Sequence, residues 1–346
     1  MTDFSKSFSY TLQVYEVDRV TWADKRLVGR FNSASVSKTN GRLVESANMT
    51  MDRSLGESFT EGYYRIAAKV TQDGSTERHD IATLYCTSVS GTVDYGVDEL
   101  TVNGLSVLYP AENCVMDFGS YAPQGSDGAA FAKNVLGEVL HAPIEVHGSF
   151  GIADNHVFDL GSKRLESVWD VLDAAGWCIQ IDERGVVHIR ELPTEPVNST
   201  TEFDIATISS GIPYGLDWSA VPNRYMAFDG TTLGVWVNDD PKSVVSTKSR
   251  GFIRDYDGGV DTNPVLVGGE TLDMYCRRML KSLSVVTHEV TKEREYSDGV
   301  YPFSVVRMAV QPTGDMMDMR VTSREIRCDN DLTVSETYAG EVSLWD

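Results

Sequence analysis

The chain has 346 residues, of which 30 are basic and 51 acidic, so its formal net charge at pH 7 is −21. This length suits two or three domains, and a hydrophobic content of 41% is ordinary for a folded protein. Binding of nucleic acid through its phosphates needs the opposite sign of charge, so we exclude that class. Residues 1–25 lack the apolar core of a secretion signal, and no stretch approaches the roughly 18 apolar residues of a membrane helix. We therefore expect no membrane insertion.

The cysteines point to a reducing compartment. They are odd in number, far apart and never arranged as C-x-x-C, which argues against a disulfide framework or a zinc ribbon. They are Cys86, Cys114, Cys178, Cys276 and Cys328. We expect free, structural thiols in a protein that folds in the cytoplasm.

The first part of the chain is typical of short β-strands. Residues 9–17 alternate between apolar and polar side chains, the period of a half-buried strand. Asn40-Gly41 and Asp73-Gly74 each have the chemistry of a hairpin turn and lie between two apolar-rich segments. This density of strands predicts a first β-barrel-like domain over residues 1–124.

The hydrophobic period then changes to that of a helix. Residues 129–140 place apolar side chains three and four apart, with Asp127 as a candidate N-terminal cap. Ser162 is a candidate cap of a second helix, which should end at Gly176. Strands are expected at 144–150 and in a hairpin at 177–190. We therefore predict a small α/β domain over residues 125–196, arranged as helix, strand, helix and hairpin.

Strand patterns return after a Pro- and Thr-rich stretch at 192–201, which we interpret as a linker. Residues 197–346 are predicted to form a second β-barrel-like domain with one helix at 270–285. The predicted fold class is thus mainly β (α+β), with two β-barrel-like domains separated by a small α/β domain. The polar face of the helix is the most basic local patch of an acidic chain, and we expect it to be a subunit interface. Its basic residues are Arg277, Arg278 and Lys281.

No catalytic or cofactor-binding motif stands out, so we expect a structural protein without enzymatic activity or cofactor. His141 and His147 are six residues apart, a spacing that does not match a structural zinc site. The best candidate for a cation is the acidic segment 255–263, which is rich in Asp and Gly as a calcium loop would be. Because Asp and Gly are also ordinary turn residues, we assign no metal ligand. Whether residues 255–261 bind a cation stays open.

The order of these segments resembles the tail hub (baseplate hub) proteins of tailed bacteriophages. In that family a hydrophobic helix, then a hairpin carrying Asp and Gly, precedes a strand with the sequence V-P-N-R, here residues 221–224. The resemblance covers residues 90–340. Its segments are 97–108, 129–140, 164–172, 177–190, 220–228 and 270–285.

The resemblance implies a homotrimer whose barrels form a ring joining a six-fold tail tube to a three-fold tail tip. The implied partners are other copies of the chain, a tube or distal tail protein, and tip or fibre proteins. The implied location is the tail tip of the virion, after assembly in the host cytoplasm. An acidic inner wall would let DNA pass without specific binding, because like charges repel.

Two alternatives remain at the level of the sequence. One is a different tail component, such as a distal tail or adaptor protein, which is typically hexameric. The other is a carbohydrate-binding or carbohydrate-active β protein, since carboxylate pairs and exposed aromatic residues meet in space rather than in sequence. The oligomeric state distinguishes these possibilities.

Overall fold

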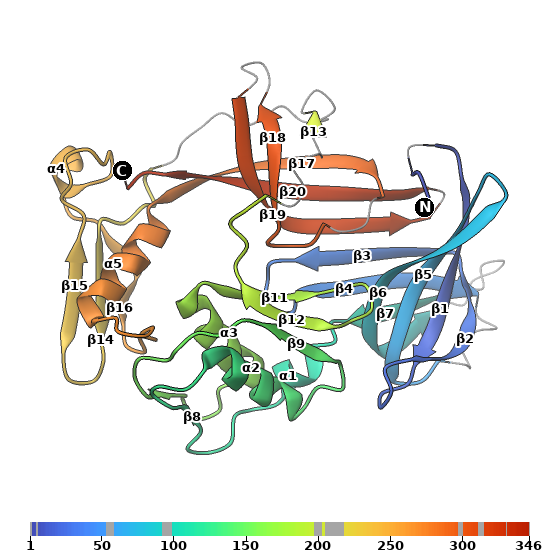
Figure 1. Cartoon of the computed structure of the whole chain (residues 1–346), viewed down its shortest axis with the longest axis horizontal. Coiled ribbons are helices and arrows are strands. Elements are labelled where there is room, and N and C mark those ends of the chain that lie inside the picture. Colours follow the sequence, from blue (N-terminus) through green and yellow to red (C-terminus); the bar gives the residue numbers. More distant parts are fainter. Residues whose placement is uncertain are drawn as a thin grey trace.

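The computed structural model describes residues 2–4, 6–52, 59–91, 99–196, 203–204, 218–296, 300–310, 315–329 and 331–345. Strands dominate, as the sequence predicts, and the described strands form one large sheet and three small ones. Figure 1 shows the large sheet along the top and right, the α/β unit below it, and a small unit around α5 at the opposite end. The long strands β17 and β20 connect that small unit to the rest of the molecule.

The large sheet contains twelve strands, ten of them in the order β13-β18-β19-β3-β4-β7-β6-β5-β1-β2. Strand β20 pairs with the edge of β19 that lies opposite β3, and β17 pairs with β20. Its strands from the first part of the chain are β1 (Ser9–Val17), β2 (Asp24–Phe31), β3 (Ser33–Thr39), β4 (Glu45–Asp52), β5 (Gly62–Gln72), β6 (Ser75–Gly91) and β7 (Glu99–Leu105). Those from the later part are β13 (Phe203–Asp204), β17 (Val285–Glu295), β18 (Val305–Val310), β19 (Asp315–Cys328) and β20 (Leu332–Ser343).

The two β-rich parts of the chain are hydrogen-bonded to each other, which the sequence analysis did not anticipate. Strand β3 pairs antiparallel with β19, and Val36 lies opposite Ile326. Both residues belong to one hydrophobic core that also takes in Leu12, Leu84 and Val334. The mainly β fold class is confirmed; closed barrels are not found among the described strands, where the two β-rich parts share one continuous sheet. The domain boundaries stay a prediction.

Charged side chains run across the junction between the two β-rich parts. Glu45, Lys38, Arg324 and Glu336 occupy facing positions on β4, β3, β19 and β20, and each is at most 3% exposed. Lys38 Nζ lies 3.2 Å from Glu45 Oε1, and Arg324 Nε lies 3.1 Å from Glu336 Oε1. Buried ions are tolerated only when they are paired, so these contacts fix which strands can meet here. We call these four residues the buried ladder.

The buried ladder should make stability depend on pH. Burial raises the pKa of Glu45 to about 7, although Lys38 opposes the shift. Between pH about 4.5 and 7 the folded chain therefore holds a proton that the unfolded chain has released, and stability is lost as the pH rises through this range. Glu45→Gln should flatten that decline, by up to about 1.4 kcal/mol per pH unit. Urea unfolding at pH 5, 6, 7 and 8 checks this, and an unchanged slope in the variant would contradict it.

The two helices, the strand and the hairpin expected between residues 129 and 190 are all present, and the α/β unit that contains them has further short elements. Its helices are α1 (Tyr109–Asn113), α2 (Gly128–Gly137) and α3 (Arg164–Ala175), and its strands are β8 (Tyr121–Ala122), β9 (Ile144–His147), β10 (His156–Val157), β11 (Trp177–Ile181) and β12 (Val187–Glu191). Asp127 caps α2 by accepting from the Ala129 N–H, and Gly176 ends α3 in the left-handed conformation. The prediction that Ser162 caps the second helix is wrong. Helix α3 begins after Lys163, whose backbone is held in a β-bridge with Val115.

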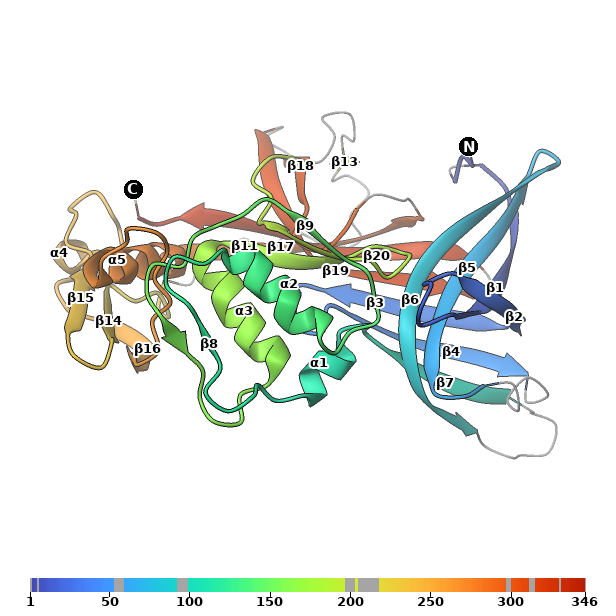
Figure 2. The ribbon, with the colours of Figure 1, turned by 60° about the horizontal axis from the view of Figure 1, so that its bottom comes forward.

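The hairpin between β11 and β12 docks this unit onto the large sheet. Trp22 Nε1–H donates to the carbonyl of Arg184 at 2.8 Å, and the hydroxyl of Thr83 donates to the carbonyl of Glu183 at 3.0 Å. Arg65, which is fully buried, donates to the same Arg184 carbonyl at 3.1 Å. The tip of the hairpin is therefore held by side chains of β5, β6 and the turn after β1. The helices α2 and α3 lie below the small sheet in Figure 1 and in front of it in Figure 2.

The remaining unit consists of β14 (Arg224–Phe228), β15 (Leu233–Val237), α4 (Thr247–Arg250), β16 (Asp255–Asp261) and α5 (Leu272–Leu283). Helix α5 confirms the helix expected at 270–285, and the side chain of Thr271 caps it by accepting from the Met274 N–H. It packs on β14 and β15 through a small core around Tyr225 and Cys276. Residues 197–201 of the expected linker lie outside the described residues.

All five cysteines are free, and four of them are buried, as expected for structural thiols. Burial raises the pKa of Cys86, Cys178 and Cys328 to about 12, so these thiols stay protonated and unreactive. Within the described part of the chain, no helix combines the length and the apolar character needed to cross a membrane.

Candidate functional site

The basic residues expected at a subunit interface lie on α5, but they do not act alike. The guanidinium of Arg278 makes two hydrogen bonds to the carboxylate of Glu270, at 2.8 and 2.9 Å, and lies over the ring of Tyr275. Arg278 is thus committed to its own subunit. Arg277 lies over the ring of Trp236, and both Arg277 and Lys281 are exposed. They are the two members of the patch that face solvent.

The acidic segment proposed as a cation loop is a strand instead. Residues Asp255–Asp261 form β16, which pairs parallel with β14. Asp255 pairs with Arg224, and Asp261 accepts hydrogen bonds from Tyr225 and Tyr275. Because these carboxylates are dispersed along an extended chain and bound to different partners, they do not converge on a cation.

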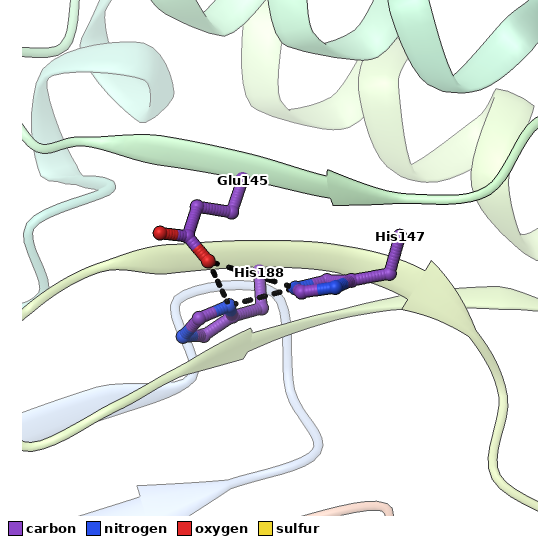
Figure 3. Close-up of side chains that lie close together, drawn as sticks. All are labelled: Glu145, His147 and His188. Carbon is purple, nitrogen blue, oxygen red and sulfur yellow. Dashed lines mark hydrogen bonds and ion pairs between the residues drawn. The ribbon is translucent and has the colours of Figure 1, made fainter.

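A different set of metal-ligand residues converges on the small sheet of the α/β unit. Strand β9 pairs parallel with β12, and this register sets Glu145 beside His188. His147 lies two residues after Glu145, so both side chains leave the same face of β9. Figure 3 shows the three side chains turned toward one another. We call Glu145, His147 and His188 the histidine cluster; it is the one group of three such residues found within the described chain.

The polar atoms of the histidine cluster lie within a few ångströms of one another. His147 Nε2 is 3.0 Å from His188 Nδ1, and Glu145 Oε2 is 3.6 Å from His188 Nδ1 and 3.9 Å from His147 Nε2. The side chains of Glu145 and His147 are 59% and 46% exposed, whereas His188 is 23% exposed. The cluster is therefore open to solvent on one side and held by a more buried imidazole on the other.

Asp182 holds the far side of His188. Its Oδ2 lies 3.5 Å from His188 Nε2, while its Oδ1 accepts from the backbone N–H groups of Arg184 and Val186. Burial would raise the pKa of Asp182, but the contacts with His188 and Val186 outweigh burial and lower it. An ionised Asp182 favours a proton on Nε2 of His188, which leaves the Nδ1 lone pair directed into the cluster.

From the sequence, His147 was weighed as a zinc ligand together with His141, which does not join the cluster, whereas Glu145 and His188 were not candidates. The only signal available was the i, i+2 spacing of Glu145 and His147 on one strand. The contribution of His188 depends on the parallel pairing of β9 with β12, which no local pattern indicates.

Large apolar side chains are exposed on the two segments that connect α1, α2 and α3. Phe118 is 91% exposed and Leu160 is 85% exposed. Tyr121 and Val157 are also exposed and lie opposite each other where β8 pairs with β10. We call these four residues the apolar patch. Large apolar side chains that gather on the surface of a folded protein typically mark a contact with another macromolecule, and here the pairing of β8 with β10 sets Tyr121 beside Val157.

Comparison of the sequence with protein-family models gives no match, and comparison with curated proteins gives none either. Comparison of the structure gives clear matches. A tail protein from Neisseria meningitidis MC58 superimposes with a TM-score of 0.65 at 11% identity, covering 96% of both chains. The 43 kDa tail protein of prophage MuSo2 from Shewanella oneidensis gives a TM-score of 0.63 at 10% identity, covering 97% of this chain and 100% of the other.

A third match is a prophage tail protein from Listeria monocytogenes EGD-e, with a TM-score of 0.53 at 11% identity, covering 95% of this chain and 94% of the other. These alignments run nearly end to end, so the whole architecture is shared and not only the large sheet. At this level of identity they establish the fold. The chain therefore shares the fold of these tail proteins, which agrees with the resemblance seen in the sequence at the level of the fold.

Proposed function

We propose that this protein is a structural subunit of a phage tail: a hub that assembles as a homotrimer and joins the six-fold tail tube to the three-fold tail tip. The observation that carries the proposal is the fold, because three tail proteins share it over at least 94% of both chains in each comparison. The role needs no catalysis, so we expect a non-enzymatic protein. It places the chain at the tail tip of the virion, after assembly in the host cytoplasm.

Two exposed surfaces of the chain support the proposal that it is a subunit of an assembly. The apolar patch exposes two side chains, Phe118 and Leu160, that are almost fully accessible in the single chain. Arg277 and Lys281 offer positive charge on a chain whose net charge is −21, so they can meet an acidic surface of a neighbouring copy. We assign the subunit contacts to these two surfaces and leave Arg278 out, because Glu270 already binds it.

The acidic composition suits the passage of DNA. In the proposed ring, carboxylates on the inner wall would repel the DNA backbone, which carries about one negative charge per 1.7 Å of axis. The wall would then bind no DNA by counterion release, and DNA would pass without specific contacts. Tail tube, distal tail and tip proteins are the partners that this position implies.

The oligomeric state tests the proposal. Light scattering on the purified protein should give a mass about three times the 38.2 kDa of the chain. Phe118→Asp combined with Lys281→Glu should lower this mass toward the monomer, while the free energy of unfolding changes by less than about 0.5 kcal/mol, since both side chains are exposed. Val20→Asp is the matched control, because Val20 is 87% exposed but lies in the turn between β1 and β2.

A monomer at all concentrations would contradict the trimer. A hexamer would favour a distal tail or adaptor protein instead. If Val20→Asp lowers the mass as strongly as the double variant does, the apolar patch and α5 are not the contact surfaces.

A further inference from the structure

We propose that the histidine cluster binds one divalent transition-metal ion, with zinc as the expected occupant. Glu145 Oε2, His147 Nε2 and His188 Nδ1 are the three ligand atoms, and water fills the fourth position. The proposal stands apart from the hub function, because it rests only on the geometry of the α/β unit.

The spacing of the three atoms matches one face of a tetrahedron. Bonds of about 2.0–2.1 Å to a tetrahedral zinc ion place neighbouring ligand atoms about 3.3 Å apart. The three separations in the cluster are 3.0, 3.6 and 3.9 Å. Two of them differ from the ideal value by about 0.3 Å and the third by about 0.6 Å, and the exposed side chains of Glu145 and His147 can absorb these differences by rotating.

The ligand set selects the class of metal. Two imidazoles and one carboxylate suit zinc and its neighbours in the first transition row, whereas calcium and magnesium prefer oxygen ligands alone. The half-exposed side chains of Glu145 and His147 leave the fourth position open to solvent, so the ion can exchange.

The support around His188 is that of a prearranged metal ligand. A ligating histidine usually donates its other N–H to a carboxylate, which fixes the ring and its tautomer. Asp182 occupies that place, 3.5 Å from His188 Nε2. Asp182 is itself held by two backbone N–H groups in a hairpin that docks on the large sheet, so the carboxylate beside His188 is in place before any ion binds.

A bound metal ion would add a link between strands β9 and β12. Strand β9 has only four residues and lies at the edge of its sheet, where β12 is its one partner among the described strands. An ion held by Glu145 and His147 of β9 and by His188 of β12 would link the strands through side chains. We therefore expect zinc to raise the melting temperature of the protein.

The test is a calorimetric titration of the EDTA-stripped, dialysed full chain with zinc chloride. We expect one zinc per chain. His147→Ala and His188→Ala should each weaken binding at least about 10-fold, and Asp182→Asn about 10- to 100-fold, as for other outer-shell partners of metal ligands. Asp182→Asn keeps an Oδ1 atom that can accept the hairpin's backbone hydrogen bonds, so we expect this variant to fold. Melting curves in EDTA verify that each variant is folded.

His141→Ala is the matched control, because His141 is exposed, lies six residues from His147 and is not part of the cluster. It should bind zinc as the unchanged protein does. The absence of zinc binding at 100-fold excess, or equal weakening by His141→Ala and His147→Ala, would overturn the proposal. Neither result bears on the oligomeric state, so a failure of the metal-site proposal can be distinguished from a failure of the proposed hub function.

Discussion

Replacing Glu336 with Gln should lower the free energy of unfolding by about 3 kcal/mol or more. Glu336 is fully buried, and its carboxylate accepts hydrogen bonds from Arg294 at 2.7 and 2.9 Å and lies 3.1 Å from Arg324 Nε. Removing its charge leaves two guanidinium groups in the sheet without their shared anion. Breaking a buried ion pair by removing one partner costs about 3–5 kcal/mol in other proteins.

The matched control for this prediction is Glu325→Gln, on the neighbouring strand β19. The carboxylate of Glu325 also binds an arginine, Arg327, at 2.9 Å, but both side chains are at least 40% exposed. Water screens such a pair, so the same substitution should cost less than about 1 kcal/mol. Guanidinium chloride unfolding of both variants measures the difference. Equal losses would mean that the buried ladder contributes no more than a surface pair does.

Gly185→Ala should strongly destabilise the contact between the α/β unit and the large sheet. Gly185 has φ +74°, and a Cβ there would lie 2.8 Å from the Cβ of the buried Thr83 and 3.2 Å from Cζ2 of Trp22. The left-handed backbone costs an alanine about 1–2 kcal/mol, and crowding in a packed contact adds about 1–3 kcal/mol. We expect a total loss of about 3 kcal/mol, because the hairpin tip can no longer dock on the large sheet.

Gly74→Ala separates these two contributions. Gly74 has φ +78°, but no atom lies within 4 Å of the position of a new Cβ. Only the backbone contribution of about 1 kcal/mol should appear there. Urea unfolding of the two variants side by side gives the difference. If both variants lose the same stability, the close approach of Gly185 to Thr83 does not hold the hairpin in place.

Elements whose signals are local were predictable from the sequence. Helix α2 begins at the predicted cap Asp127, α3 ends at Gly176, and the turn at Asp73-Gly74 joins β5 to β6. Each of these depends on a few neighbouring residues and their backbone preferences. The Ser162 cap failed because a β-bridge between Lys163 and Val115, set by tertiary structure, decides where α3 begins.

Contacts between distant segments were not predictable in this way. The pairing of β3 with β19 brings Val36 next to Ile326, and strand patterns alone do not indicate which strands are partners. The same limit applies to the histidine cluster, because His188 reaches Glu145 only through the parallel pairing of β9 with β12. The pairing of Arg278 with Glu270, eight residues away on the same chain, was likewise not indicated by the sequence, while its expected place in a subunit interface stays a prediction.

The most direct test of the hub function is an electron cryomicroscopy reconstruction of the tailed particle that is encoded together with this protein. The proposal predicts three copies of the fold around the axis at the junction of the tail tube and the tail tip, with the apolar patch and the exposed basic side chains of α5 in contacts between subunits. Absence of the protein from the particle, or six equivalent copies of it, would contradict the proposal.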